Sequence, residues 1–251
     1  MTRTPPFDDL LTLIDDRSAA LRSAAAAAPS LEARVPGCPD WSLDDLVYHL
    51  GTVQRFWAVT TRLADTSGPP GADQRAFPDP GGDLLGWSAE STALLLDALR
   101  AAGPDSPAWT WWAASGAPMT AAAIARHQVQ EAAVHAYDAQ ETAGKPDPLP
   151  AAVAVDGVAE FLSVGMSCLG PWPHRPARVA FTATEGPAWL VDLSPAGVEF
   201  EPAASGDPVT TVHGTASDLV LALYKRIPAD DLRVDGDRTV LTELLAWSAT
   251  E

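Results

Sequence analysis

The sequence predicts an α+β protein of two domains, a four-helix bundle over residues 1–146 and a smaller α+β domain over residues 147–251. Three observations lead to this prediction. Apolar residues in the first half recur at helical spacing in four long segments. The second half alternates short β-like runs with helical ones. Prolines are concentrated at 146–150, between the two patterns, and the second domain is expected to hold a short mixed or antiparallel sheet.

Two helices open the predicted bundle. The first covers residues 7–28, because its leucines and isoleucine recur at spacings of three, four and seven, and Pro29 follows it. The second begins after Ser42, which can cap a helix N-terminus, and two aspartates follow in the first turn, where negative charge suits the helix dipole. This helix is expected to run to about Leu63.

Two further helices complete the bundle. The third spans residues 83–102, and the fourth runs from Pro118 or Thr120 to Ala143, with Gly144 placed to end it. The connection between the second and third helices is long and rich in Gly and Pro. Connections of this length are often functional.

The second half predicts short elements. Helices are expected at 150–168, 215–225 and 239–247, and strands at 178–184, 188–193, 198–200, 209–213 and 232–234.

Composition limits the classes of partner. The 33 acidic and 16 basic residues give a net charge of −17, which repels nucleic acid and anionic membranes. Cys38 and Cys168 lie far apart and suggest no disulfide framework. The chain shows no signal-type leader and no run of about 18 apolar residues, so we expect a cytoplasmic protein without membrane partners.

Three residues form a candidate metal-binding site. Glu131 and His135 are four residues apart, so a helix places them on one face, one turn apart. His49, on the second predicted helix, can supply a third ligand to a shared metal. The spacing alone is also compatible with core histidines that are satisfied by hydrogen bonds.

Three motifs carry a family resemblance. Residues 35–57 (VPGCPDWSLDDLVYHLGTVQRFW) and 126–139 (RHQVQEAAVHAYDA) resemble two motifs of the mycothiol-dependent maleylpyruvate isomerase family, a branch of the DinB-like metal-binding bundles. Residues 212–236 (VHGTASDLVLALYKRIPADDLRVDG) resemble the C-terminal domain of that family, a sterol-carrier-like module. The motifs lie in both halves of the chain, in the expected order.

The resemblance implies a metal centre with His49, Glu131 and His135 as ligands. Zinc is the expected divalent metal, because it accepts imidazole nitrogen and carboxylate oxygen. Three protein ligands leave positions open for substrate or thiol, which points to a catalytic centre. Mycothiol is the implied cosubstrate.

Residues near the metal motifs have open interpretations. Asp138 is either an acceptor for an imidazole N–H or a surface carboxylate. His127 is close to the ligand face, but the family motif does not use it, and Cys38 has no evident base. Trp57 and Trp112, with Trp111, either line the cofactor pocket or fill the mouth of the bundle.

Three arginines are candidates for binding anionic groups. We predict Arg126 as a cofactor-binding clamp and Arg75 as a catalytic residue that orients an anionic substrate. The resemblance implies a basic catalytic residue that binds an anionic group after the helix of the C-terminal domain, which is Arg226 or, one position earlier, Lys225. The alternatives are an ordinary surface charge for Arg126, a solvated loop charge for Arg75, and favourable charge at a helix C-terminus for Arg226.

The function implied by the resemblance is a metal-dependent enzyme. A mycothiol thiolate attacks an electrophilic carbon of a small molecule, giving cis–trans isomerisation if the thiol is expelled and S-transfer if it stays. One alternative is a thiol-independent metal enzyme of specialised metabolism, and another is a non-catalytic protein that binds a small ligand. A monomer or homodimer is expected.

Overall fold

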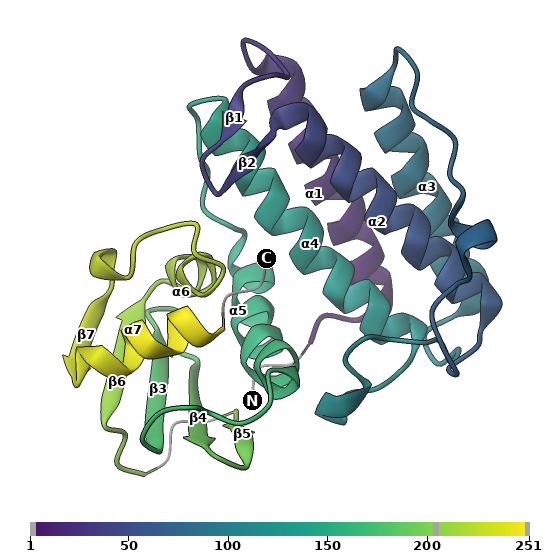
Figure 1. Ribbon diagram of the computed structural model, residues 1–251. Helices are drawn as coiled ribbons and strands as arrows, with labels where there is room; N and C mark the ends of the chain where they lie inside the picture. The colour runs from purple at the N-terminus through teal and green to yellow at the C-terminus, as the bar shows by residue number, and fades with distance from the viewer. Residues whose placement is uncertain (1–3, 203–205, 249–251) are drawn as a thin grey trace. The chain divides into compact units, whose positions relative to one another are not determined.

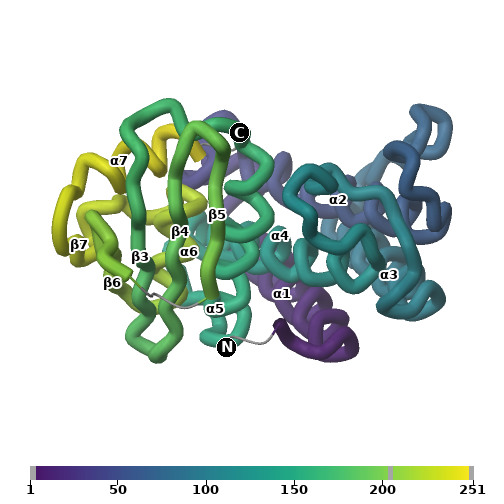
Figure 2. The backbone as a smooth tube through the Cα atoms, turned by 90° about the horizontal axis from the view of Figure 1, so that it is seen from below, coloured from purple at the N-terminus to yellow at the C-terminus, as the bar shows by residue number. Residues whose placement is uncertain are grey.

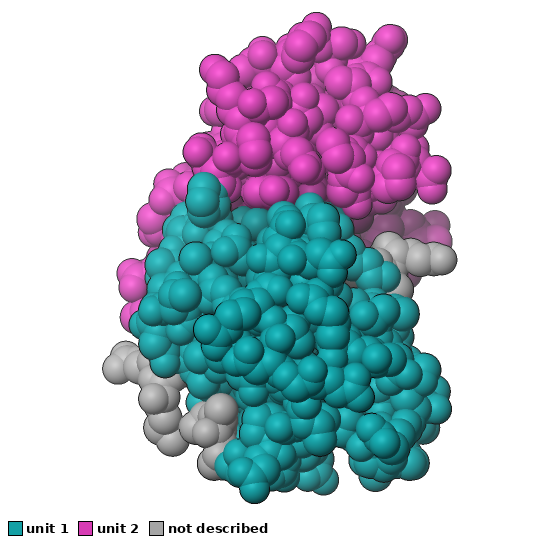
Figure 3. Space-filling view, turned by 90° about the vertical axis from the view of Figure 1, so that its left-hand side faces the viewer, with its two compact units in different colours: residues 1–4, 114–116, 148–251 teal, residues 5–113, 117–147 magenta. Residues whose placement is uncertain are grey.

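The computed structural model describes residues 4–202 and 206–248. The chain divides into two compact units, which Figure 3 colours separately. The N-terminal unit comprises residues 5–113 and 117–147. The C-terminal unit is built mainly from residues 148–251.

Four long helices make up the N-terminal unit, as predicted (Figure 1). They are α1 (Phe7–Ala27), α2 (Leu43–Leu63), α3 (Leu84–Ala102) and α4 (Ala121–Thr142). The most extensive contacts join α1 to α4 and α2 to α3. Short 3₁₀ helices at Ala72–Arg75 and Ala113–Ser115 interrupt the two long connections.

Local sequence signals fix the ends of the helices. The Ser42 hydroxyl accepts a hydrogen bond from the Asp45 N–H at 3.2 Å, and the Asp45 carboxylate accepts one from the Ser42 N–H at 2.8 Å. This capping box fixes the first turn of α2 and contributes about 1 kcal/mol to the stability of the protein. Gly144 follows α4 with a φ of 75°, a left-handed conformation that glycine adopts without strain.

A small hairpin precedes α2. Strands β1 (Arg34–Val35) and β2 (Cys38–Ser42) pair antiparallel, with Val35 opposite Cys38 across the Pro-Gly turn. The sequence predicts only a tight connection here, because strands this short show no alternation of apolar and polar residues. The hairpin brings the residues before α2 against the bundle.

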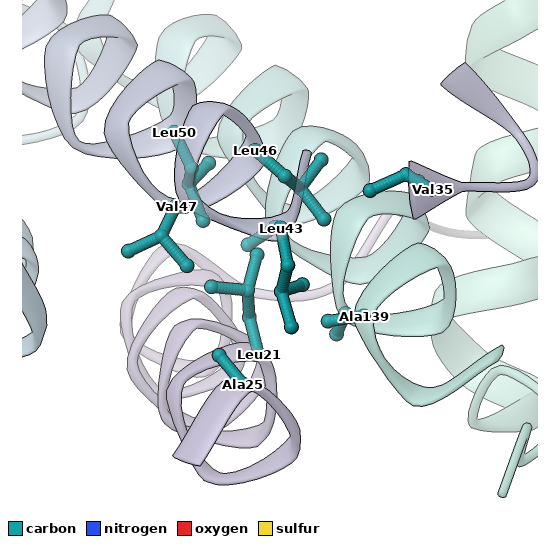
Figure 4. Close-up of a cluster of buried hydrophobic side chains, with 10 residues drawn as sticks. Leu21, Ala25, Val35, Leu43, Leu46, Val47, Leu50 and Ala139 are labelled. Atoms are coloured by element: carbon teal, nitrogen blue, oxygen red, sulfur yellow. The ribbon is translucent and has the colours of Figure 1, made fainter. Parts of the chain in front are cut away.

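A hydrophobic cluster holds α1, α2, α4 and β1 together (Figure 4). Its labelled members, all buried, are Leu21, Ala25, Val35, Leu43, Leu46, Val47, Leu50 and Ala139. Ala132 and Ala136 of α4 belong to the same cluster, and their small side chains leave space for the neighbouring helices. The cluster therefore fixes α2 and α4 in one arrangement, on which the site described below depends.

Gly51 is a point of close helix contact, and Gly51→Ala is expected to destabilise the protein by about 1–3 kcal/mol. A Cβ at this position would collide with the indole of Trp87. That indole cannot easily retreat, because it stacks on Tyr48 at 5.3 Å and lies 4.6 Å beneath the Arg55 guanidinium. Urea unfolding measures the loss. The matched control is Gly165→Ala, where no atom beyond the neighbouring residues and the backbone of the same helical turn lies within 4 Å of the added methyl group, and it should show no loss.

The C-terminal unit contains a five-stranded mixed sheet in the order β5-β4-β3-β6-β7 (Figure 2). Neighbouring strands pair antiparallel except β3 and β6, which are parallel. The strands are β3 (Ala177–Ala183), β4 (Ala188–Ser194), β5 (Gly197–Glu201), β6 (Thr210–Gly214) and β7 (Arg233–Gly236). The helices are α5 (Ala151–Glu160), α6 (Ala216–Leu223) and α7 (Arg238–Trp247), and a short 3₁₀ helix covers Ala229–Asp231. The predicted α+β class is confirmed.

The first helical stretch of this unit continues beyond α5. A π-helical turn at Phe161–Gly165 and a 3₁₀ turn at Met166–Cys168 extend it. The stretch Ala151–Cys168 is long and apolar enough to cross a membrane, with a mean hydropathy of 1.4, but 61% of it is buried within the protein. Burial of this kind is expected of a core helix.

Candidate metal centre

Three potential metal ligands converge in the N-terminal unit. His49 extends from α2, and Glu131 and His135 extend from consecutive turns of α4. One ligand atom from each residue lies within 4.8 Å of the other two, and within residues 4–202 and 206–248 no other His, Cys, Asp or Glu group meets this condition. Glu131 Oε2 lies 3.4 Å from His135 Nε2 and 3.9 Å from His49 Nε2.

Asp138 holds the His135 ring in position. Its Oδ2 lies 2.9 Å from His135 Nδ1, and its side chain is fully buried. With the proton on Nδ1, the lone pair of Nε2 faces Glu131. Asp138 is thus an acceptor for the imidazole and not a surface carboxylate. Burial alone would lower the pKa of His135, but hydrogen bonds to Asp138 and Glu131 raise it to about 9.

The hairpin before α2 also contributes to the site. The Trp41 ring lies 4.6 Å from the His49 ring and 6.2 Å from the His135 ring, between centroids. The Cys38 thiol lies 3.9 Å from the same Asp138 oxygen that contacts His135 Nδ1. The sequence gives no sign of these contacts beyond the motif itself.

His127 lies one turn before Glu131 on α4, close to the ligand face as the spacing indicates, although the family motif does not use it. Its Nε2 is 3.5 Å from Glu131 Oε1, whereas Nε2 of His49 and Nε2 of His135 contact the other carboxylate oxygen, Oε2. Burial alone would raise the pKa of Glu131, but the contacts with His127, His135 and His49 hold it well below the usual range. Glu131 is therefore an anion at neutral pH, as a metal ligand must be.

The residues present fit a divalent metal. Two imidazole nitrogens and one carboxylate oxygen form a donor set that zinc accepts, with ligand distances near 2.0–2.2 Å. Two such donors on a tetrahedral ion lie roughly 3.3 Å apart. The separations of 3.4 and 3.9 Å from Glu131 Oε2 need only a small adjustment to meet this value.

Two protein-family models match the chain. Residues 11–140 match the mycothiol maleylpyruvate isomerase N-terminal domain, and residues 152–243 match the MDMPI C-terminal domain. The chain belongs to the mycothiol maleylpyruvate isomerase family. The resemblance in the three sequence motifs is thereby confirmed.

Solved structures agree with this family on the fold. A crystal structure of mycothiol-dependent maleylpyruvate isomerase matches with a TM-score of 0.60, and that of a histidine-to-alanine mutant with 0.61. Each match has 16% sequence identity and covers 92% of this chain and 93% of the other. Both domains of the isomerase fold are therefore present.

Two curated mycobacterial proteins share part of the sequence. Each is named "Putative S-adenosyl-L-methionine-dependent methyltransferase", one from Mycobacterium ulcerans and one from Mycobacterium marinum. Each is 38% identical over 115 residues, which is 45% of this chain and 33% of the relative. The matched segment thus spans about a third of the length of these relatives.

The tryptophans of this family member form a cluster around His127. Trp57 and Trp112 are 3% and 2% exposed, and the Trp112 indole N–H donates to the Pro118 carbonyl at 3.2 Å. Trp111 is 45% exposed. The predicted pocket residues Trp57 and Trp112 thus pack inside the unit, and Trp111 presents an open face to solvent. Their contact with a thiol stays a prediction.

The three candidate arginines occupy different elements. Arg126 lies on α4 beside His127 and is partly buried, whereas Arg75 is exposed at the end of the 3₁₀ helix Ala72–Arg75. Arg226 follows α6 in the C-terminal unit, where its guanidinium donates to the Tyr224 carbonyl at 2.8 Å. It also lines a cavity of about 450 Å³ within that unit. Their assigned roles stay predictions.

Proposed function

We propose that the protein is a divalent-metal-dependent enzyme that uses mycothiol to isomerise a small electrophilic substrate. The observation that carries the proposal is the His49, Glu131 and His135 centre in a chain of the maleylpyruvate isomerase family. Three protein ligands leave coordination positions open, which is typical of catalytic zinc sites and not of structural ones.

The charge of the centre suits a thiol. Metal ligation requires both imidazoles in the neutral form, so the three ligands then carry a single negative charge. When bound, a divalent cation supplies net positive charge and favours the thiolate form of a sulfur beside it. Trp41 packs beside the two imidazole rings, and Asp138 holds His135 in the tautomer that a ligand needs.

The reaction then follows from thiolate chemistry. The thiolate adds to one carbon of a double bond that is conjugated with a carbonyl group, and the π electron pair moves onto the carbonyl to give an enolate. The bond between the two carbons is then single. Rotation about this bond and expulsion of the thiolate restore the double bond in the trans form. The thiol is regenerated, and no other co-reactant is consumed. If the adduct is not expelled, the outcome is S-transfer.

Cobalt substitution tests whether the thiol reaches the centre. The protein loaded with Co²⁺ and titrated with mycothiol is expected to gain sulfur-to-cobalt absorption in the near ultraviolet, with a change in the visible bands. An unchanged spectrum at saturating thiol would overturn thiol ligation.

A product assay separates the enzymatic alternatives. Maleylpyruvate is incubated with the zinc-loaded protein in the presence and absence of mycothiol. A trans product that needs the thiol supports isomerisation, whereas an accumulating thiol adduct supports S-transfer. Turnover without thiol would favour a thiol-independent metal enzyme. We do not propose methyl transfer, because the chain spans only a third of the relatives with that name.

A further inference from the structure

His127 is a fourth histidine beside the three ligands, but it lies on a different side of Glu131. Oε2 of the carboxylate faces His49 and His135, and Oε1 faces His127 at 3.5 Å. Among the described residues, the donors within 4.8 Å of one another do not include His127. His127 is therefore placed to contact the carboxylate and not a metal shared by the other three.

The chemistry of the loaded centre gives His127 a distinct role. Once His49 and His135 use their Nε2 lone pairs as ligands, neither nitrogen can donate a proton to Glu131. Nε2 of His127 remains able to donate to Oε1. An N–H that donates to one carboxylate oxygen withdraws charge from that oxygen and fixes the group's orientation, so a metal is favoured at the other oxygen.

The position of the His127 ring is fixed by aromatic side chains. The ring centroids of Trp57, Trp111 and Trp112 lie 6.1, 5.6 and 5.1 Å from that of His127. The side chain of His127 is only 11% exposed. Aromatic pairs at these distances favour a defined ring orientation. The tryptophan cluster therefore holds Nε2 of His127 toward Glu131.

We propose that His127 is a positioning residue that restricts Glu131 to ligation through a single oxygen, Oε2. This keeps coordination positions open for thiol and substrate. The proposal rests on the metal-binding part of the proposed function, and it assigns the tryptophan cluster the task of orienting His127.

Three substitutions at His127 test the hydrogen bond. His127→Gln retains an N–H close to the position of Nε2, whereas His127→Asn is too short to reach Oε1. His127→Phe retains the ring and its aromatic contacts but has no donor. The matched control is His174→Gln, because His174 lies 3.5 Å from Glu243 in the C-terminal unit and has no part in the centre.

Two readouts that do not depend on activity decide the outcome. Competition with a chromophoric chelator should show zinc affinity reduced about 10–100-fold in the Phe and Asn variants, and within a few-fold of wild type in the Gln variant and the control. The visible Co²⁺ bands should weaken in the Phe and Asn variants, because a second carboxylate oxygen raises the coordination number.

Each result supports or overturns the proposal. Wild-type affinity and spectrum in His127→Phe would overturn it, and so would a Gln variant that behaves like the Asn variant. If the Phe variant does not fold, the Gln and Asn pair decides. Failure of the wild-type protein to bind metal would instead contradict the proposed function, so the two failures are distinguishable.

Discussion

Replacing His135 by alanine is expected to lower zinc affinity by more than about 100-fold. Loss of a residue that only supports a ligand costs about 10–100-fold, and loss of a ligand itself must cost more. The substitution leaves Glu131 and His49 as the only two donors of the centre and removes the contact at 3.4 Å. Competition titration with a chelator measures the affinity, and metal content after dialysis gives the stoichiometry.

Comparing zinc affinity between ligand variants and a control variant tests whether these residues bind the metal. His49→Ala should show the same loss as His135→Ala, although the two residues come from different helices. His174→Ala is the control, because His174 also pairs with a glutamate but lies in the C-terminal unit. Retention of one tightly bound metal in both site variants would show that the three residues are not its ligands.

The main elements of the fold are predictable from the sequence, for a physical reason. Each bundle helix is long, periodic and marked by local end signals, such as Ser42 before α2 and Gly144 after α4. These signals depend on neighbouring residues alone. The hairpin of β1 and β2 depends on packing against α4 and α2, so its short strands carry too little pattern to be recognised.

The site is predictable only in part. The four-residue spacing of Glu131 and His135 is local to one helix, so the sequence alone places them together. The distance from His49 to Glu131 and His135 depends on how α2 packs against α4. The assignment of His49 as the third ligand therefore rests on the family resemblance. The contact of His127 with Glu131 is likewise local to α4, at the same four-residue spacing. The contacts of Trp41 with His49, and of His127 with the tryptophans, join different elements, and no spacing along the chain encodes them.

Protons are expected to compete strongly with zinc for the Nε2 atom of His135. In the metal-free protein, the pKa of His135 is about 9, and a proton on Nε2 must leave before zinc binds. Zinc affinity should therefore rise with pH, by up to about tenfold per pH unit from this group, and level off above about pH 9. Chelator competition across this range measures the profile.

Asp138→Asn should change this profile in two ways. The amide carries no negative charge, so the pKa of His135 falls and the plateau of zinc affinity is reached at lower pH. The plateau itself should be about 10–100-fold lower, because the ring loses its charged acceptor at 2.9 Å. Identical pH profiles for the variant and the wild-type protein would contradict the role of Asp138.

Stability of the metal-free protein provides an independent check with a defined sign. The folded-state pKa of His135 lies above its ordinary value of 6.5, so the protonated ring stabilises the folded protein. This contribution is complete below about pH 6.5 and is lost as the pH rises through about 9. Urea unfolding of chelator-treated protein at about pH 6 and about pH 9.5 should show a larger loss in the wild type than in Asp138→Asn. The carboxylate that prepares His135 to bind a metal thus also makes the metal-free centre retain a proton.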